Sequence, residues 1–253
     1  MDLFDLSGRV VIVTGASGGI GRALATGLAG QGVHVVLAAR REEILMALEQ
    51  ELPGSLAVRC DVAVDHDRAQ LVEQALRRFG RIDGLVNNAG ILGAGVPAAR
   101  ESTEKFVEVL NVDLVAPFDL AKRCLPAFRE QGGGSIVNVT STAAILSAAY
   151  CYPQAAYCAA KGGLAQLTKE LAAQWARYDV RVNAFAPGFF ATEMTEELTV
   201  ATAGPRQRLM SRVPMGRGAE PEDALGVVQF LLSDASRYVT GQQIAVDGGY
   251  TIF

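Results

Sequence analysis

The sequence contains few of the residues that most often bind metal ions or form disulfide frameworks. Its 253 residues include two histidines and four cysteines. His34 and His66 stand apart from any group of cysteines or carboxylates at ligand spacing, so we expect no structural or catalytic metal site. The cysteines are Cys60, Cys124, Cys151 and Cys158. They form no C-x-x-C pair, and a chain of this length needs no disulfide framework, so we expect reduced thiols.

The sequence also lacks an excess of positive charge and a long apolar run. The formal net charge is −4, and the basic doublets at 40–41 and 77–78 are too short to make a surface for nucleic-acid phosphates. No apolar run approaches the roughly 20 residues of a membrane span, and residues 1–5 do not begin a basic segment followed by an apolar one. We therefore expect a cytoplasmic protein that binds neither nucleic acid nor membrane.

Apolar residues, in contrast, are plentiful enough for a large core, because they make up 50% of the chain while charged residues make up 20%. Many of them lie in six short runs rich in β-branched residues, at 10–13, 33–37, 85–86, 136–139, 180–182 and 244–246. Near-continuous apolarity without alternation is typical of parallel strands covered by helices on both faces. The pattern predicts one doubly wound α/β domain over residues 1–253, without internal repeats.

Two helices are marked by their terminal residues. One is predicted over 65–79, where Asp65 can cap the start and Gly80 ends the helix. Another is predicted to begin at Pro221, with Glu222 and Asp223 in its first turn. Between them in the sequence, the segment at about 189–218 has an irregular composition. We expect it to cover a ligand bound beyond the carboxyl ends of the strands.

A glycine-rich turn follows the first predicted strand and precedes a helical pattern. Its sequence is Thr14-Gly15-Ala16-Ser17-Gly18-Gly19-Ile20-Gly21. Glycines at 15, 19 and 21 allow a tight turn and a close approach of the backbone to a pyrophosphate, which the free N–H groups of the next helix would stabilise. An ordinary glycine-rich turn is the alternative. The strand before and the helix after favour a nucleotide site.

Tyr157 and Lys161 are four residues apart in a helix-favouring stretch, so they share a face. A tyrosine has an unperturbed pKa of about 10. One nearby cation supplies about 4 kcal/mol, equivalent to about three pKa units, before desolvation is subtracted. Lys161 is therefore expected to bring the Tyr157 phenol towards neutral pH. A simple contact on a helix surface is the alternative for an isolated pair of this kind.

The glycine spacing G-x-x-x-G-x-G resembles that of the short-chain dehydrogenase/reductase family, and the resemblance extends across nearly the whole chain. In the family's order follow Asn87-Asn88-Ala89-Gly90, Asn111, Ser141, Tyr157 with Lys161, Pro187-Gly188 and Val246-Asp247-Gly248-Gly249. The resemblance implies a Rossmann-type oxidoreductase that interconverts a ketone and a secondary alcohol. It also implies a homotetramer, in which the apolar C-terminus at 250–253 could be buried.

The identity of the nucleotide is decided after the second strand, where an acidic residue would bind the ribose 2′-OH of NAD. The sequence there is Ala38-Ala39-Arg40-Arg41, without a carboxylate. Arg40 can hold a 2′-phosphate with its guanidinium group, so NADP(H) is the expected cofactor. The alternative is that Arg40 is an ordinary residue in the first turn of a helix.

By resemblance, Tyr157 exchanges the proton, Ser141 orients the substrate oxygen, and Asn111 holds a water that links Lys161 to solvent. The expected cofactor contacts are Gly15, Ser17, Gly19, Ile20, Gly21, Arg40, Arg41, Asp61, Val62, Asn88, Ala89, Gly90, Tyr157, Lys161, Pro187, Gly188 and Thr192. Asn87 could instead only bridge neighbouring strands, and Asp61 could only cap a turn. The 141–157 segment is a few residues longer than is usual in the family. We favour Ser141 over Ser147 because Ser141 directly follows a strand.

The sequence says less about the substrate than about the cofactor. Phe189, Phe190, Met194 and Leu198 offer apolar contacts, and Thr195, Arg206 and Arg208 offer polar ones. We expect a small ketone, keto-acid or sugar/polyol substrate. A 3-oxoacyl thioester is an alternative, and a non-catalytic NADP-binding redox sensor is an alternative of a different class.

Overall fold

The computed structural model describes residues 2–147, 152–193, 195 and 210–252. Within this part of the chain, seven strands form one parallel sheet in the order β3-β2-β1-β4-β5-β6-β7. The predicted parallel sheet is thereby confirmed. The strands are β1 (Val10–Thr14), β2 (His34–Ala39), β3 (Leu56–Arg59), β4 (Gly84–Asn87), β5 (Gly134–Val139), β6 (Val180–Pro187) and β7 (Gln243–Val246).

Strand β3 was not among the six predicted runs. It lies at the edge of the sheet, where it pairs with β2 alone, starting with Leu56 opposite Val36. Only Val58 of its four residues is buried, and Arg59 is exposed. The apolar run of β3, 56–58, contains a single β-branched residue, so its sequence does not show the β-branched pattern of the central strands.

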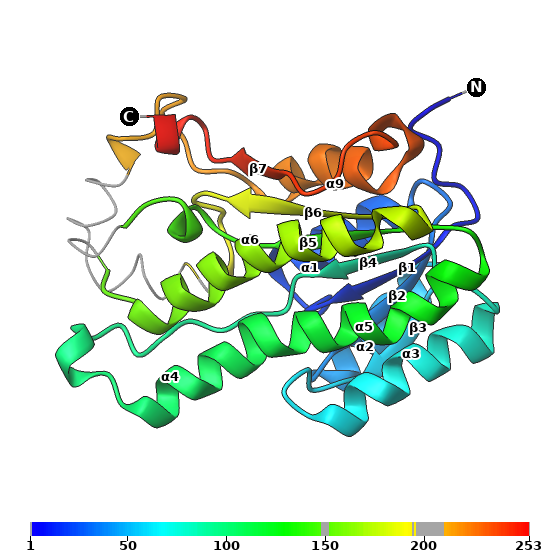
Figure 1. Ribbon diagram of the computed structural model, residues 1–253, viewed down its shortest axis with the longest axis horizontal. Coiled ribbons are helices and arrows are strands. Elements are labelled where there is room, and N and C mark those ends of the chain that lie inside the picture. Colours follow the sequence, from blue (N-terminus) through cyan, green and yellow to red (C-terminus); the bar gives the residue numbers. More distant parts are fainter. Residues whose placement is uncertain (1, 148–151, 194, 196–209, 253) are drawn as a thin grey trace.

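Helices cover both faces of the sheet (Figure 1). The major ones are α1 (Gly19–Ala29), α2 (Glu42–Glu51), α3 (Asp65–Phe79), α4 (Thr103–Leu110), α5 (Ala116–Glu130), α6 (Ala155–Trp175) and α9 (Leu225–Leu232). One buried cluster joins the sheet to α3, α5 and α6, and a second joins its other face to α1, α2 and α9. None of the helices described is both long and apolar enough to cross a bilayer.

The two helices predicted from their ends are present, with differences in detail. Helix α3 spans the predicted residues and ends at Gly80, whose φ of 72° is the left-handed conformation that glycine favours. Asp65 is its first helical residue and not its cap, since Val64 holds the cap position. The segment from Pro221 starts as a 3₁₀ turn, η5 (Pro221–Ala224), and then continues as α9.

The order of the strands determines where a ligand can bind. Strand β1 lies between β2 and β4, so the chain leaves it towards one side of the sheet and later returns on the other. A crevice forms at such a switch point, beyond the carboxyl ends of the strands. In Figure 1 these ends point to the left, where the first turn after β1 and the start of α6 also lie.

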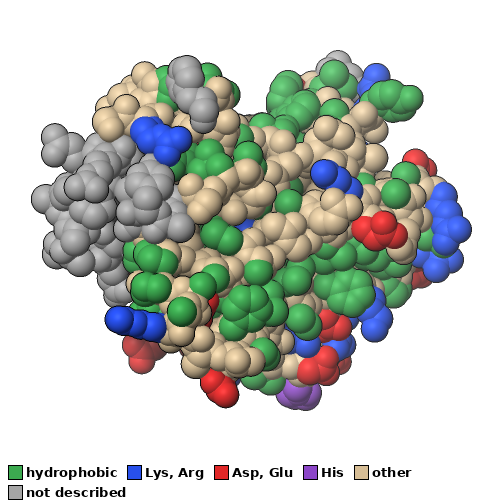
Figure 2. Space-filling view, turned by 60° about the vertical axis from the view of Figure 1, so that its left-hand side comes forward, with side chains coloured by type: hydrophobic (Ala, Val, Ile, Leu, Met, Phe, Trp, Pro, Cys, Tyr) green, Lys and Arg blue, Asp and Glu red, His purple; other side chains and the backbone are tan. Residues whose placement is uncertain are grey.

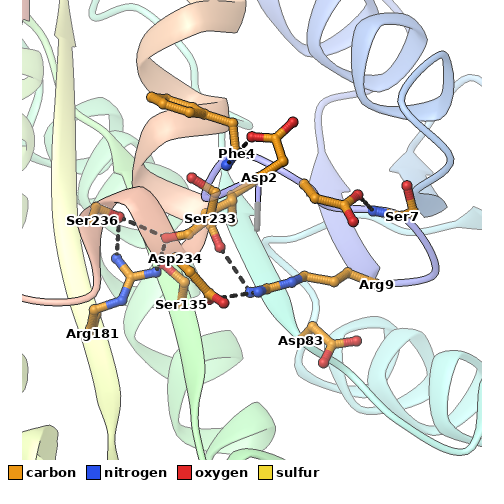
Figure 3. A network of polar contacts seen from close by, with 12 residues as sticks. Asp2, Phe4, Ser7, Arg9, Asp83, Ser135, Arg181, Ser233, Asp234 and Ser236 are labelled. Carbon is orange, nitrogen blue, oxygen red and sulfur yellow. Dashed lines mark hydrogen bonds and ion pairs between the residues drawn. The ribbon is translucent and has the colours of Figure 1, made fainter.

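The opposite end of the sheet is held by two arginines (Figure 3). Arg181, in β6, donates to the carbonyl oxygens of Leu231 (2.7 Å) and Ser233 (3.1 Å) and to the hydroxyl of Ser236 (2.6 Å). Arg9, before β1, donates to the Leu232 carbonyl at 3.2 Å and pairs with Asp234 at 2.6 Å. The last carbonyls of a helix have no partner within it, and these guanidinium groups bind them at the end of α9.

We predict that Arg181→Ala lowers the free energy of unfolding by about 2 to 3 kcal/mol, because it leaves buried carbonyl oxygens without a charged donor. Burial, the larger cause, and nearby Arg9 lower the pKa of Arg181 to about 10, so the group remains charged at neutral pH. Denaturant unfolding measures the effect. Arg77→Ala is the matched control, since Arg77 makes only a surface pair with Glu73, and a loss of equal size there would contradict the assignment.

Candidate active site

The turn after β1 has the geometry of a site for a bound phosphate group. Gly15 has a φ of 71°, which is in the left-handed region. Helix α1 starts at Gly19, and its cap residue Gly18 provides no side chain to bind the first N–H groups. The first turn of α1 contains no acidic residue, and the carboxylate nearest its N-cap in space is Glu193, which lies 3.4 Å from the place of a Cβ at Gly18.

Asn88 ties this turn to the end of β4. Its side-chain nitrogen donates to the Thr14 carbonyl at 2.8 Å, and the Thr14 hydroxyl accepts from the backbone nitrogens of Asn88 (2.9 Å) and Ala89 (3.0 Å). A Cβ at Gly15 or Gly21 would lie 2.7 or 2.5 Å from the same Asn88 nitrogen. Both glycines therefore make room for Asn88 as well as for a ligand. The sequence predicts Asn88 as a cofactor contact and does not indicate this contact with Thr14.

The arginine that contacts the glycine turn is Arg41. Its guanidinium group donates to the Ser17 hydroxyl at 3.1 Å and to the Ser17 carbonyl at 3.0 Å, and pairs with Glu193 at 3.0 Å. A Cβ at Gly18 would lie 2.6 Å from the Arg41 Nη2 atom, so the missing side chain leaves space for the guanidinium group. Arg40 is exposed and directly follows β2, whose Ala38 carbonyl accepts from the Ala16 N–H of the turn at 3.2 Å. Two arginines thus follow β2 at the place where a carboxylate would select NAD, and one of them, Arg41, is paired with Glu193.

Beyond β3, the predicted contact residues form a turn of their own. The Asp61 carboxylate accepts from the Ala63 N–H at 3.0 Å, which is the turn-capping role left open by the sequence. Val62 is buried and packs in the core. The Asn111 side chain donates to the Ala63 carbonyl at 3.2 Å and so belongs to this turn. Asn87 bridges β4 and β5 through Asn138 at 2.9 Å, again the structural alternative.

Tyr157 and Lys161 occupy successive turns of α6, with the Lys161 ammonium nitrogen 5.5 Å from the centre of the Tyr157 ring. Lys161 is buried, with 3% of its side chain exposed, and donates to the Val139 carbonyl at the end of β5 at 3.0 Å. Ser141 follows β5 and forms a hydrogen bond with the Tyr157 hydroxyl. The structure therefore brings Ser141, Tyr157 and Lys161 together at the carboxyl edge of the sheet.

Asp113 joins this group through Lys161, a contact that the sequence analysis did not predict. The Asp113 carboxylate lies 3.2 Å from the Lys161 nitrogen and is completely buried. Asp113 and Asn111 both belong to the π-helix η2 (Asn111–Val115), but their side chains leave it towards different neighbours, Lys161 and Ala63. The contact with Ala63 occupies the side chain of Asn111, and the water-holding role given to Asn111 by resemblance stays a prediction. The sequence does contain an indication of this ion pair: Asp113 lies in the apolar stretch 110–115, and an acidic residue in such a stretch needs a buried partner.

The surroundings of Tyr157 also correct the estimate made from Lys161 alone. Removal of the phenol from water, the largest cause, raises the pKa of Tyr157 above its usual value, and the charge of Asp113 raises it further. Lys161 and the hydrogen bond from Ser141 lower the pKa without offsetting these effects. The sequence estimate omitted Asp113 and left desolvation unsubtracted, and for that reason it gave the wrong direction.

The remaining predicted residues lie around the same crevice. Pro187 ends β6, and a Cβ at Gly188 would lie 2.7 Å from the Asp247 Cα atom, so the two chain segments are in close contact. Thr192 packs against Gly19, where a Cβ would lie 3.1 Å from the threonine methyl group. Gly90 faces Asp113 and Lys161. Ile20 is partly buried and packs on the core formed with α1.

The segment at 189–218 is described at its two ends. The ends pair with each other, because Ala191 donates to the Ala219 carbonyl and Ala219 to the Phe189 carbonyl, both at 2.8 Å. Phe190 is buried against Phe185, and the Thr195 hydroxyl donates to the Phe190 carbonyl at 2.6 Å. These contacts fix the described ends of the 189–218 segment. Four residues proposed as substrate contacts lie outside the described residues: Met194, Leu198, Arg206 and Arg208.

The C-terminal end only partly fits the expected burial between subunits. Tyr250 is already buried within the chain and packs edge-to-face on Phe189 at 5.0 Å, whereas Ile252 is 72% exposed. Figure 2 shows the face that includes the carboxyl edge of the sheet; acidic and basic side chains are scattered over it, with hydrophobic ones between them. Among the described residues, no group of three or more histidines, cysteines or carboxylates could hold a metal ion.

A doubly wound parallel sheet with this glycine turn and this tyrosine–lysine pair defines a Rossmann-type oxidoreductase. The chain belongs to the short-chain dehydrogenase/reductase family. A family model described as enoyl-(acyl carrier protein) reductase matches residues 15–251.

Known relatives cover nearly the whole length of the chain. A 3-oxoacyl-(acyl-carrier-protein) reductase of Thermotoga maritima is 40% identical, over 98% of this chain and 99% of its own. A 2,5-dichloro-2,5-cyclohexadiene-1,4-diol dehydrogenase of Sphingobium indicum is 38% identical, over 98% of both chains. The solved structure of a gluconate 5-dehydrogenase from Burkholderia cenocepacia, in complex with NADP and tartrate, has a TM-score of 0.92 at 34% identity, covering 100% of this chain and 98% of its own.

The packing of the glycine turn leads to a stability prediction. We expect Gly21→Ala to lower the free energy of unfolding by about 1 to 3 kcal/mol, because its Cβ would overlap the Gly15 carbonyl oxygen, a backbone atom that cannot rotate away. Gly226→Ala in α9 is the control: nothing lies within 4 Å of its Cβ, so a gain of about 0.5 to 1 kcal/mol is expected. Thermal unfolding compares the two, and equal effects would show that the turn tolerates a side chain.

Proposed function

We propose that this protein is an NADP(H)-dependent oxidoreductase that interconverts a ketone and a secondary alcohol. The observation that carries the proposal is the meeting of Ser141, Tyr157 and Lys161 at the carboxyl end of β5, beside the glycine turn after β1. A proton-exchanging phenol and a dinucleotide site at the same edge of the sheet suit hydride transfer coupled to proton transfer.

The residues at the crevice fit a dinucleotide. The uncapped N-terminus of α1 and the closely packed glycines would hold the pyrophosphate, and Arg40 and Arg41 would hold a 2′-phosphate. When bound, NADP(H) would supply or accept the hydride. The gluconate 5-dehydrogenase relative was solved with NADP, which agrees with this assignment.

The side chains divide the proton chemistry among them. The Tyr157 hydroxyl donates its proton to the carbonyl oxygen in reduction and takes it back in oxidation. Lys161 is anchored on Val139 and Asp113, and its positive charge stabilises the phenolate that forms after donation. The Ser141 hydroxyl holds the same substrate oxygen in line with Tyr157. Buried contacts fix each group, so little ordering is required when substrate binds.

The substrate we propose is a small ketone, keto-acid or sugar/polyol. The relatives include a gluconate 5-dehydrogenase, a diol dehydrogenase and a 3-oxoacyl-(acyl-carrier-protein) reductase. A 3-oxoacyl thioester is therefore the second candidate, supported by the highest of the reported identities, 40%. A panel of diketones, keto-acids, ketoses and 3-oxoesters, assayed by NADPH absorbance, separates the two classes.

We expect Tyr157→Phe to reduce kcat/KM by about a hundredfold to ten-thousandfold on any substrate found in that panel, since phenylalanine keeps the ring but has no proton to donate. Tyr178→Phe is the control. Tyr178 packs under Arg129 and lies just before the amino end of β6, at the end of the sheet opposite the site. Equal NADPH consumption by wild type and Tyr157→Phe would overturn the tyrosine mechanism. NADPH binding without turnover of any member of the panel would favour the redox-sensor alternative.

The two arginines lead to a prediction about cofactor choice. Arg41→Ala and Arg40→Ala are each expected to raise the KM for NADPH about tenfold to a hundredfold, the value of one charge-assisted contact to a phosphate. The KM for NADH should change little, since NADH has no 2′-phosphate. Arg77→Ala on α3 serves as the charge-matched control. A parallel rise for both nucleotides would mean that these arginines support the glycine turn and do not read the phosphate.

A further inference from the structure

Asp113 is a completely buried carboxylate beside the proposed proton-transfer group. It lies in the π-helix η2 between α4 and α5, and none of its side chain is exposed. A π-helical turn is uncommon and is often found at functional sites, because it displaces side chains from their regular helical positions. Burying a charge is costly unless it is paired and hydrogen-bonded. The contacts of Asp113 therefore indicate what the residue does.

The two carboxylate oxygens serve different elements. Oδ1 accepts from the backbone N–H of Ile91 at 2.8 Å, in the segment that follows β4. Oδ2 lies 3.2 Å from the Lys161 nitrogen on α6. An asparagine has a single acceptor oxygen, so it could serve Ile91 or Lys161 but would turn an N–H group towards the other. The pair of contacts requires a carboxylate.

Gly90 completes this arrangement. A Cβ at position 90 would lie 2.9 Å from Asp113 Oδ2 and 3.3 Å from the Lys161 nitrogen. The ion pair therefore packs directly against the main chain after β4, the segment that also carries Asn88 and its contact to the glycine turn. Through Asp113, the proton-transfer group and the proposed dinucleotide site are joined by short contacts.

The charges around Tyr157 come from several elements. Lys161 and Cys158 belong to its own helix, and Asp113 belongs to η2. Lys105 of α4 acts on Asp113 and is itself paired with Glu108 at 3.0 Å. Glu101 accepts from the Ala156 N–H at 3.2 Å, at the start of α6. Tyr152 lies near Gly95, where a Cβ would be 2.7 Å from its hydroxyl oxygen. Of these charges, only those of Lys161, Asp113 and Cys158 act on Tyr157 to a resolved extent.

We propose that Asp113 is a positioning residue of the active site, which fixes the Lys161 ammonium against the main chain after β4 and balances its positive charge beside Tyr157. This inference rests on the proposed function, in which Tyr157 exchanges the proton. The carboxylate keeps the pKa of Lys161 above its ordinary value despite the opposing effect of burial. Its negative charge acts against the phenolate form of Tyr157, whose pKa it raises.

Removing the negative charge of Asp113 is expected to shift the pH dependence of Tyr157 deprotonation in one direction. In alcohol oxidation Tyr157 must be deprotonated, so kcat/KM rises with pH as the phenol loses its proton. Without the Asp113 charge, the phenolate is easier to form. We expect Asp113→Asn to move the midpoint of this rise to lower pH by about one unit, the usual effect of one nearby charge. Asp113→Ser, which also removes the charge, should move it in the same direction.

The experiment measures two pH profiles for the full chain. The first is kcat/KM for NADP⁺-linked oxidation of an alcohol found in the substrate panel. The second is phenolate absorbance against pH without substrate, from which the same titration of a Tyr157→Phe background is subtracted. The second profile reports Tyr157 even in a protein that turns over nothing. Failure of the proposed function would appear in the first profile alone, and failure of the Asp113 inference would appear in the second.

Asp119→Asn is the control, because Asp119 is a partly buried, ion-paired carboxylate six residues along the chain. It accepts from Arg68 and Arg123 at 2.7 Å and makes no contact with the active-site group. Its loss should reduce stability without moving either profile. An unchanged or upward-shifted Tyr157 midpoint in both Asp113 variants, or an equal downward shift in Asp119→Asn, would overturn the inference.

Discussion

The contact on which the site depends is the one made by the buried Lys161 ammonium. It binds the Val139 carbonyl at the end of β5 and the Asp113 carboxylate on η2, and it lies beside the Tyr157 ring on its own helix. A buried cation has to be satisfied on every side, because desolvation is costly. The need to satisfy one charge therefore fixes the relative positions of a strand, a π-helix and a long helix, and with them the phenol that exchanges the proton.

A second constraint joins this group to the proposed nucleotide site. The segment after β4 passes between them, with Asn88 bonded to Thr14 on one side and Ile91 bonded to Asp113 on the other. Glycines stand at each point of close approach, since a Cβ at Gly15, Gly21 or Gly90 would meet one of these polar groups. The glycine pattern thus reflects packing of the protein against itself as much as the approach of a phosphate group.

The sequence patterns were most informative where one local cause dominates. Buried strands read as apolar runs, and the αL glycine at position 80 ended α3 at the predicted residue. They were less informative where several groups compete. Edge strand β3 has only one β-branched residue, Val58. The direction of the Tyr157 pKa shift depends on burial and on Asp113, neither of which spacing along a helix reveals. Spacing along the sequence also did not reveal that the side chain of Asn111 contacts the Ala63 carbonyl.

The sequence by itself determined the class of fold, the order of glycine turn and proton-transfer helix, and the absence of a carboxylate after β2, because each of these is written in consecutive residues. Only the tertiary structure decided which partners the side chains find. Arg41 reaches Ser17 through space left by Gly18, and Asp113 meets Lys161 from 48 residues away. Such pairs form because the sheet brings the ends of distant strands to one edge, where a buried charge must find its counterpart.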